Sequence, residues 1–378
     1  MKVEDKGLIC EAGKRPGSDT AAAFIGLSAA ASGTIFCIFQ IGPTKNAATS
    51  KLLVYRSRDR GSSWQEMSFP FETQIKGIPG AFSSGQIVEA EPGKLLLIAT
   101  WFDRHDPAQP FFDPVTEGLL PSKQLLAFST DEAESWSAWE ILTTPGLQAC
   151  SSTGPLLKWS DGVIGFPFEN LKQFDDPKSA VPGAWCMLSK DGGRSFESPR
   201  TIARDPENKI YFWDQRLSPG RKPGEFFGLF WTYDRENQKD LEIHCIHSNL
   251  YGDPSENTQL FTTKLIGQIA APLLLEDGKL LAFVVERSSP GTLTLWLSKD
   301  LGVSWLENLV VYRHDQTLTA PPGASSNEYA DYWEEMGKWS FGHPTILHLG
   351  GRHVLLAYYA GVPNRTNIHW ARIDISDT

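Results

Sequence analysis

Short apolar segments separated by glycine-containing turns recur along the whole chain. Each apolar strand after such a turn is preceded by another apolar run, so each pair is predicted to form a β-hairpin with a tight turn. The turns are Ser32-Gly33, Pro92-Gly93, Asp161-Gly162, Pro223-Gly224, Asp277-Gly278 and Gly350-Gly351. The strands that follow them are Thr34–Ile41, Lys94–Asp103, Val163–Glu169, Glu225–Asp234, Lys279–Arg287 and His353–Ala360. This repetition predicts an all-β fold built from similar units.

A third strand follows each hairpin, and four of these third strands end in a shared motif, S-x-D-x-x-x-S-aromatic. The copies are Ser57–Trp64, Ser129–Trp136, Ser189–Phe196 and Ser298–Trp305. They start at residues 57, 129, 189 and 298, so the intervals are 72, 60 and 109 residues. The last interval is nearly two periods, and a degenerate copy is expected at 248–253. The sixth third strand is predicted at Asn367–Ile375, where the chain ends.

The motif has a structural explanation. Its aspartate accepts backbone N–H bonds across a turn, its glycine takes a positive φ, and its aromatic ring packs between strands. We therefore exclude these aspartates from catalysis.

The four copies resemble the Asp-box, or BNR, repeat of sialidases and related proteins, over nearly the whole chain. The resemblance implies a six-bladed β-propeller with four antiparallel strands per blade. The last blade has only three strands before Thr378, so a segment around Lys6–Glu11 is predicted to supply its fourth strand and close the ring. Residues 1–378 would then form a single domain.

The charge of the chain excludes several partners. Lys and Arg total 35 against 45 Asp and Glu, a net charge of −10, and no long basic run occurs. Nucleic acid and anionic membranes are therefore not expected as partners. The uncharged stretch 20–44 is long enough for a membrane helix, but its Ser32-Gly33 break predicts a hairpin.

Cysteine spacing and motifs indicate neither a metal nor a cofactor. The five cysteines are an odd number with no C-x-x-C pair, so buried thiols are expected rather than a disulfide framework or a zinc site. No metal-binding signature and no glycine-rich phosphate loop appears. The segment Met1–Cys10 is polar and mixed in charge, unlike a secretory signal, which predicts a cytoplasmic protein or a mature secreted or periplasmic one.

The loops predict where the functional site lies. One face of the expected propeller carries the short Asp-box turns, and the other receives the long segments 104–122, 170–182, 205–210 and 314–338. Function usually resides on variable loops held by a rigid scaffold, so the site is predicted on the long-loop face at the central axis. Asn327–Met336, with Tyr329, Tyr332 and Trp333, is helix-compatible and is a candidate lid.

Polar residues at the strand ends on that face are the site candidates. Glycosidases need an acid with a raised pKa and a second carboxylate or other nucleophile across the sugar ring. Candidate catalytic residues are Asp103, Glu169, Asp214, Glu286, Tyr358 and His343. Candidate substrate-binding residues are Arg15, Gln86, Arg104, His105, Arg216, Tyr233, Arg287, Tyr359 and Trp333. Successive strand residues face opposite sides, so only one of Tyr358 and Tyr359 is expected to face the axis.

The sialidase resemblance assigns roles to several of these candidates. It implies three arginines for a substrate carboxylate (Arg104, Arg216 and Arg287), Asp103 as acid/base, and Tyr358 or Tyr359 with Glu286 or Glu169 as nucleophile pair. The sialidase motif aromatic-Arg-Ile-Pro is not present in Lys14–Asp19, where Arg15 remains as the candidate. The class of enzyme is therefore predicted, and sialic acid as its sugar is not.

Three function classes follow. The first is an exo-acting glycoside hydrolase of the sialidase-like superfamily acting on a sugar, acidic or neutral. The second is a polysaccharide lyase in which His343, Tyr233 and Arg287 carry the chemistry. The third is a non-catalytic propeller that binds a glycan or a protein. Two axial carboxyl groups about 5–10 Å apart favour hydrolysis, whereas a lone His or Tyr facing an arginine favours the lyase.

Each candidate also has a structural interpretation. Arg216 and Arg287 would pair with Asp214 and Glu286 as ion pairs of the scaffold. His105 and His343 would be hydrogen-bonded loop residues.

Overall fold

Nearly all regular structure in the computed structural model is β-strand, which confirms the predicted fold class. The structure describes residues 1–113, 115–144, 149–152, 154–179, 181–252, 258–288, 290–315 and 329–376, without the side chains of 329–331, 333 and 334. The helical elements in this part are the 3-10 helix η1 (Ala12–Lys14) and the α-helix α2 (Tyr329–Lys338). No helix among these residues is long and apolar enough to cross a membrane.

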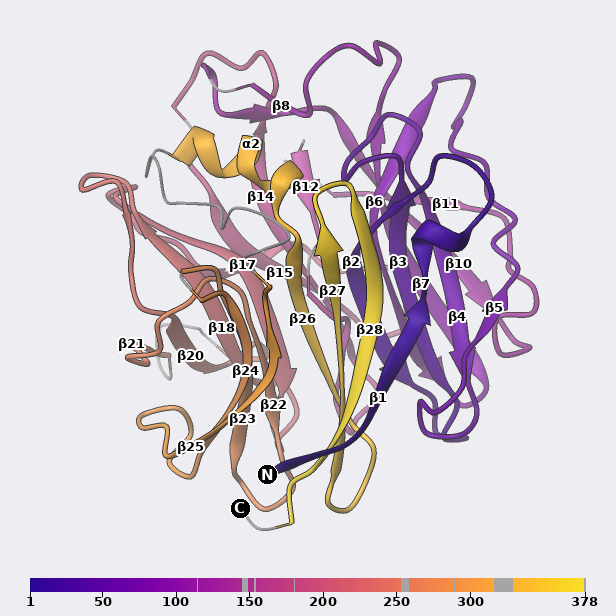
Figure 1. The fold of residues 1–378 in the computed structure, drawn as a ribbon. Helices are drawn as coiled ribbons and strands as arrows, with labels where there is room; N and C mark the ends of the chain where they lie inside the picture. Colours follow the sequence, from indigo (N-terminus) through magenta and orange to yellow (C-terminus); the bar gives the residue numbers. More distant parts are fainter. Residues whose placement is uncertain are drawn as a thin grey trace.

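Strand pairing gives five sheets, and the largest contains both the first and the last strands of the chain, joined by a single parallel pair, Ala21↔Thr366. Divided at that pair, the strands are described here as six groups, and Figure 1 shows their arrangement. Group one is β2 (Ala21–Ala29), β3 (Ile35–Gly42), β4 (Lys51–Ser57) and β5 (Gln65–Met67). Group two is β6 (Gly80–Glu91), β7 (Lys94–Asp103), β10 (Ser122–Ser129) and β11 (Glu140–Leu142). Group three is β12 (Ala149–Ser151), β13 (Leu157–Lys158), β14 (Ile164–Gln173), β15 (Gly183–Ser189) and β16 (Arg200–Ala203).

The later groups follow the same order. Group four is β17 (Ile210–Pro219), β18 (Glu225–Asp234), β20 (His244–Asn249) and β21 (Gln259–Thr262), with the short β19 (Lys239–Asp240) beside β18. Group five is β22 (Ala270–Leu274), β23 (Leu280–Glu286), β24 (Thr292–Ser298) and β25 (Glu307–Arg313). Group six is β26 (Phe341–His348), β27 (His353–Val362), β28 (Arg365–Asp374) and β1 (Lys2–Cys10). The short strands β8 (Phe112–Asp113) and β9 (Gly118–Leu119) pair with each other, and β9 pairs with β14.

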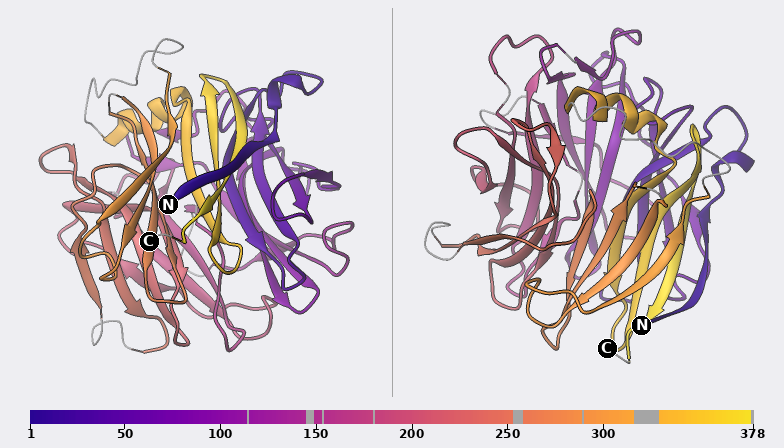
Figure 2. Two further views of the ribbon diagram at one scale, coloured as in Figure 1. Left: turned by 60° about the horizontal axis from the view of Figure 1, so that its bottom comes forward. Right: turned by 60° about the vertical axis from the view of Figure 1, so that its left-hand side comes forward.

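The two ends of the chain pair with each other. β1 runs antiparallel to β28, from the Lys2↔Asp374 pair to the Cys10↔Ile368 pair. Figure 2 shows the indigo N-terminal strand beside the yellow C-terminal strands. This is the strand predicted around Lys6–Glu11, placed a few residues earlier. The first strands also contact one another in order, β2 with β6, β6 with β13, β13 with β17, β17 with β22, β22 with β26, and β26 with β2.

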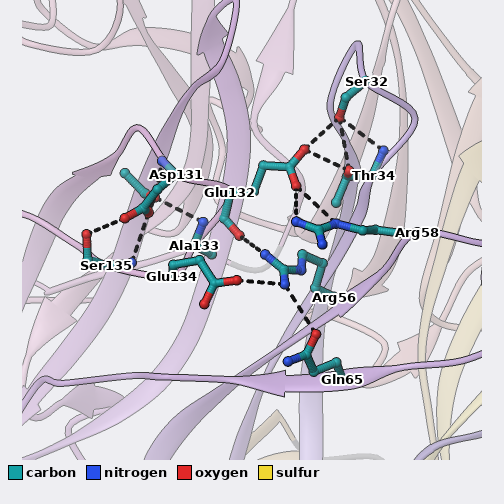
Figure 3. A network of polar contacts seen from close by, with 11 residues as sticks. Ser32, Thr34, Arg56, Arg58, Gln65, Asp131, Glu132, Ala133, Glu134 and Ser135 are labelled. Carbon is teal, nitrogen blue, oxygen red and sulfur yellow. Dashed lines mark hydrogen bonds and ion pairs between the residues drawn. The ribbon is translucent and has the colours of Figure 1, made fainter.

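The repeated aspartates are occupied by their own turns. Asp131 accepts the Ser135 backbone N–H at 2.9 Å and the Ser135 hydroxyl at 2.6 Å (Figure 3). Asp59, Asp191 and Asp300 hold Ser63, Ser195 and Ser304 in the same way. At the degenerate position, Asn249 accepts the Tyr251 N–H at 2.8 Å. These side chains close turns, as predicted, and lie on the face opposite the long loops.

Neighbouring groups are joined by apolar packing and by polar bridges. A buried cluster combines Phe36 and Val54 of group one with Leu97 and Leu125 of group two. At the rim, Arg56 of group one donates to Glu134 at 2.8 Å and to the Glu132 carbonyl at 3.0 Å, both in the second motif turn (Figure 3). The groups therefore form a rigid scaffold around the axis.

Candidate functional site

A pocket lies where the first strands of the six groups meet, at the end of the molecule that carries α2. The side chains that line it come from all six groups, from α2 and from the loop before β8. They are Phe24, Asn46, Ser83, Ser84, Phe111, Ser151, Glu169, Leu171, Trp213, Asp214, Trp231, Ile269, Arg287, Tyr332, Met336, Trp339, His343 and Tyr359. α2 crosses the upper end of the molecule in Figure 1, and its Tyr332 and Met336 form a roof over the pocket. This pocket thus lies on the long-loop face, where the sequence predicts the site.

Bulges in the first strands place three of these side chains. The ladder slips by a residue between Ala23 and Gly26, between Trp213 and Arg216, and between Gly342 and Thr345. Within these bulges lie Phe24, Asp214 and His343, with φ values of 54°, 51° and 51°. A bulky residue at positive φ is an outlier, and such strain concentrates at functional sites. β6 has a fourth slip between Phe82 and Ser84, beside the pocket residue Ser83. Bulges re-aim side chains out of a ladder, and here they aim them at the axis.

Glu169 and Asp214 form a carboxyl pair in the pocket. Glu169, 8% exposed, lies on the second strand of group three and accepts the Gln215 backbone N–H at 2.9 Å. Burial, and then the charge of Asp214, raise the pKa of Glu169 to about 8. Asp214 forms an ion pair with Arg216, with 3.4 Å between Oδ1 and Nη1. Two neighbouring carboxyl groups therefore occupy different environments, one apolar and one paired with a cation.

Arg216 lies beneath the pocket rather than in its wall. It is 2% exposed and lines a second, smaller cavity along the axis, together with Gln86 and the apolar side chains of Ile25 and Leu27. Burial lowers the pKa of Arg216, and the charges of Asp214 and Glu169 oppose that shift. Arg216 and Gln86, both predicted to bind substrate, are placed to support the floor of the pocket instead.

His343 lines the pocket and has one ring N–H without a hydrogen-bond partner among the described residues. Its Nδ1 accepts the Ile25 backbone N–H at 2.9 Å, so in the neutral ring the proton is on Nε2. Nε2 is buried and has no hydrogen-bond partner within the described part of the chain. Burial and the charges of Arg216 and Arg287 hold the pKa of His343 well below its usual range. The imidazole is therefore a neutral donor, available to a ligand.

Arg287 and Tyr359 form the opposite wall. Arg287 donates to the Gln268 side chain at 2.7 Å and to the Phe341 carbonyl at 3.3 Å, and its guanidinium lies 3.8 Å from the Trp339 ring centre. It also hydrogen-bonds the Tyr359 hydroxyl, and burial raises the pKa of Tyr359. Tyr359 contacts the cations Lys45 and Arg287, and the charge of Asp214 also acts on it, but within the described residues no hydrogen bond joins it to Glu169 or Glu286. The Tyr–Glu pair implied by the resemblance is therefore not formed.

Three of the predicted carboxylates and bases lie elsewhere. Asp103 binds exposed His105, with 2.8 Å between Oδ1 and Nδ1, outside the pocket. Glu286 accepts the Ser288 hydroxyl and faces a separate groove between groups four and five. Tyr358 is core, its ring stacked on His369 with centres 5.3 Å apart. Strand alternation sends Tyr359 to the pocket and Tyr358 away from it, so the catalytic prediction for Tyr358 is wrong.

The remaining predicted binding residues are also away from the pocket lining. Arg15 pairs with Glu66 and donates to the Tyr55 hydroxyl at 3.1 Å, on the outer strands of group one. It follows β1, the outermost strand of group six, so the chain has not yet reached the axis. Arg104 stays within its own loop, donating to the Gln109 carbonyl at 3.4 Å. Tyr233 packs behind the pocket against Tyr332, with ring centres 5.7 Å apart. The side chain of Trp333, and residues 327 and 328 of the predicted lid, lie outside what the structure describes.

Sequence reasoning missed Lys45, Phe24 and Trp339. Lys45 is the first charge after the uncharged stretch 20–44, a signal that was available in the sequence. Phe24 and Trp339 belong to an apolar pattern that predicts core, and only the bulge and the roof bring them to the pocket. No group of three or more His, Cys, Asp or Glu side chains among the described residues is arranged to hold a metal ion.

Comparison with known proteins finds similarity in structure alone. No family model matches the sequence, and no curated protein matches it. A protein of unknown function from Dyadobacter fermentans has a TM-score of 0.70 at 16% identity, covering 99% of both chains. The Hadza microbial sialidase Hz136 has a TM-score of 0.68 at 16% identity, over 98% of this chain and 69% of that one. The α-L-arabinanase of Penicillium chrysogenum, solved with arabinobiose, has a TM-score of 0.65 at 12% identity over the whole of both chains. The chain therefore has the β-propeller fold of sialidases and of an arabinanase.

Proposed function

We propose that this protein is an exo-acting glycoside hydrolase in which Glu169 is the general acid and Asp214 is its carboxylate partner. The observation that carries the proposal is the pair itself. Glu169, with a pKa raised to about 8, is protonated at neutral pH, and Asp214 is held beside Arg216. Glycosidases use a pair of carboxyl groups, and a raised pKa marks the group that acts as the acid.

The chemistry divides between the two groups. Glu169 donates its proton to the glycosidic oxygen as the bond to the anomeric carbon breaks. Asp214 either activates a water on the opposite face of the sugar or attacks the anomeric carbon itself. The first course inverts the anomeric centre and needs carboxyl groups about 6.5–9.5 Å apart, and the second retains it at about 5–5.5 Å. The anomer released, followed by NMR, distinguishes the two.

The rest of the pocket is suited to one terminal sugar. The rings of Trp213, Trp231 and Tyr332 supply apolar surface for a sugar face. The His343 N–H and the polar groups of Arg287 and Tyr359 are within the lining to bind hydroxyls or one carboxylate. The roof encloses the site, which favours a chain end over the middle of a polymer. The fold shared with sialidases and an arabinanase supports carbohydrate as the substrate class.

The three-arginine clamp is not part of this proposal. Arg287 is the arginine that lines the pocket among the described residues, whereas Arg216 lies below it and Arg104 beside it. Neutral pentosides and hexosides therefore belong in the test beside acidic sugars.

A panel of chromogenic glycosides, including arabinosides, sialosides and uronides, tests the proposal. We expect release from at least one, reduced about 10²-fold or more in Glu169→Gln and Asp214→Asn, the usual effect of losing acid–base chemistry. Asp103→Asn is the matched control, because its carboxylate pairs with His105 outside the pocket, and it should retain activity. Turnover that survives Glu169→Gln on a substrate with a poor leaving group would contradict the role of Glu169.

A lyase is the second candidate, favoured by the contact of Tyr359 with Arg287. A tyrosine base beside an arginine that neutralises a uronate would give an unsaturated product. The same screen therefore carries an absorbance channel for the unsaturated ring. Absorbance growth that is lost in Tyr359→Phe and kept in Glu169→Gln would favour the lyase. Silence on all substrates would favour a binding propeller.

A further inference from the structure

The roof residues Tyr332 and Met336 belong to the segment 332–339, which we call the roof segment. Near its end, two backbone carbonyl groups accept hydrogen bonds from Lys45, a residue far away in the chain. The last carbonyl groups of a helix have no partner within the helix. At the end of α2, the Met336 carbonyl accepts the Lys45 ammonium at 2.8 Å, and the Trp339 carbonyl accepts it as well. Lys45 belongs to the loop after β3 in group one, almost 300 residues away in the chain.

Lys45 is buried, and its amine group lies among hydrogen-bond acceptors, while burial and the charge of Arg287 hold its pKa well below its usual range. Lys45 is 5% exposed, and such burial is rare for a lysine that has no polar or charged partner. An ammonium group has three N–H donors. The structure supplies three acceptors, the carbonyls of Met336 and Trp339 and the Tyr359 hydroxyl at 3.5 Å. An ammonium buried for packing alone would carry a desolvation cost with no such set of partners.

The loop that carries Lys45 is held in place by hydrogen bonds to the Gln40 side chain. The Gln40 side chain accepts the Asn46 backbone N–H at 3.1 Å and donates to the Phe82 carbonyl at 2.8 Å. Asn46 in turn contacts the Met336 sulfur at 3.8 Å. Lys45 is therefore presented to the roof by a rigid loop rather than reaching it on a mobile one.

The other contacts of the roof lie on the far side of the pocket. Tyr332 packs edge-on against Trp231, with ring centres 5.0 Å apart, and hydrogen-bonds Asp240 of group four. Trp339 is covered by the Arg287 guanidinium of group five. Lys45 and its neighbour Asn46 thus join the roof to group one, and Lys45 also contacts Tyr359 inside the site.

We propose that Lys45 is a positioning residue of this site, which holds the roof segment 332–339 closed over the pocket and fixes the Tyr359 hydroxyl beneath it. The expected effect on catalysis rests on the proposed function, whereas the closure of the roof segment by Lys45 does not. Lys45 is absent from the pocket lining, so it acts through the roof and Tyr359 and not on the substrate.

Hydrogen exchange tests the structural part directly on the full chain. In Lys45→Met, amides of 332–339 should exchange about tenfold faster or more, since the buried hydrogen bonds to the Met336 and Trp339 carbonyls are lost. Exchange in β27 and β28 should change little. Lys45→Gln, which keeps N–H donors without the charge, should fall between Lys45→Met and the wild type. Lys94→Met is the matched control. Lys94 also lies over an aromatic ring, that of Phe128, but it is the first residue of β7 and has no contact with the roof among the described residues.

Two results would overturn the inference. One is an unchanged exchange rate in 332–339 of Lys45→Met. The other is loss of the whole fold in both Lys45→Met and Lys45→Gln with no selective opening of 332–339, which would make Lys45 an ordinary core residue.

Kinetics then test the catalytic part with whichever chromogenic glycoside is turned over. We expect Lys45→Met to raise KM about tenfold while kcat changes less than about threefold, as for a lost binding contact. A fall in kcat at constant KM would instead place Lys45 in the chemical step and overturn the positioning role. If no glycoside is turned over, the proposed function fails, and the exchange experiment still decides whether Lys45 holds the roof.

Discussion

Burial and neighbouring charges set the ionisation of single residues around the axial pocket. The same surroundings that raise the pKa of Glu169 depress that of His343, because burial always disfavours the charged form. A protonated carboxyl group and a neutral imidazole are both hydrogen-bond donors. Both groups therefore offer neutral donors to an oxygen-rich ligand, beside the buried guanidinium of Arg287.

The activity of a glycosidase with Glu169 as its acid should fall at alkaline pH. The group must be protonated to act, and its pKa is raised to about 8. We expect kcat/KM to decline as pH rises through about 8, the basic limb of a bell-shaped profile. Measured pH–rate profiles check this, and a basic limb below pH 6 would argue against Glu169 as the acid.

The same shift predicts how stability depends on pH. The folded pKa of Glu169 is above its ordinary value of 4.5, so its stabilising contribution is complete below 4.5 and is lost as pH rises through about 8. Glu169→Gln cannot ionise, and its unfolding free energy should decline less over pH 5–8 than that of the wild type. Urea unfolding at several pH values tests this, and parallel curves for the two proteins would contradict it.

His343 should remain a neutral Nε2–H tautomer across the physiological range. Its pKa is lowered well below 6.5 and its Nδ1 accepts a backbone N–H, so protonation in the folded state is opposed twice. We expect the ring ¹⁵N shifts of His343 to stay constant between pH 5 and 8. Because the unfolded ring binds a proton below 6.5, this histidine also lowers stability as pH falls through that value. A titration midpoint near 6.5 in the folded protein would refute the assignment.

At the scale of elements, the motif turns provide stability and the bulged first strands provide the site. Asp191 illustrates the first role. It accepts the Ser195 N–H at 3.0 Å and the hydroxyls of Ser195 and Ser189 at 2.5 and 2.8 Å, and its pKa is lowered to about 2. These hydrogen bonds stabilise the turn, which lies at the end of the molecule opposite the pocket.

Asp191→Ala should therefore destabilise the protein by about 1 kcal/mol, the net value of a surface hydrogen-bonded turn. Activity at a temperature well below unfolding should be unchanged. Thermal unfolding and the glycoside assay, run on the same preparations, check both statements. Loss of activity without loss of stability would show that the motif turn has a second role.

The sequence predicted the elements that repeat, but it did not predict the residues that lie where the repeat is interrupted. The glycine turns and the Asp-box spacing predicted the hairpins and the occupied aspartates, because both depend on local turn chemistry. Glu169 was found because it lies on a regular second strand, which the structure extends beyond it to Gln173. Arg15 was misplaced because the first strand of group one starts at Ala21, so the position that reaches the axis is Phe24.

Long-range packing explains the other differences. Nothing local indicates that Lys45 meets α2, because that contact joins segments almost 300 residues apart in the chain. Asp103 and Arg104 were expected at the pocket from the end of β7, but hydrogen bonds within their own loop hold them aside. Position on a strand end was therefore a good guide to the face of the molecule and a poor guide to the lining.

At the scale of the whole molecule, the pairing of β1 with β28 joins the first and last segments of the chain. It covers the edge of β28 along its length, where Trp370 and Ile368 are buried. An uncovered edge strand presents unpaired backbone groups and invites association with other chains.

Deletion of residues 1–10 should lower the unfolding temperature and promote aggregation, because β28 becomes an open edge with exposed apolar residues. Light scattering and thermal unfolding measure the two effects. Deletion of 1–5 removes only the more exposed half of β1 and should be milder. An unchanged unfolding temperature and unchanged light scattering after removal of residues 1–10 would show that group six does not depend on its N-terminal strand.

The bulges of the first strands separate the chemistry of the axis from the architecture of the sheets. A residue in a bulge makes no ladder hydrogen bond, so its identity is free of the demands of strand pairing. Phe24, Asp214 and His343 differ completely in chemistry, yet they occupy equivalent places in three groups. The sheets therefore fix where these side chains stand along the axis, while an aromatic ring, a carboxylate and an imidazole each fit the same kind of place in the ladder.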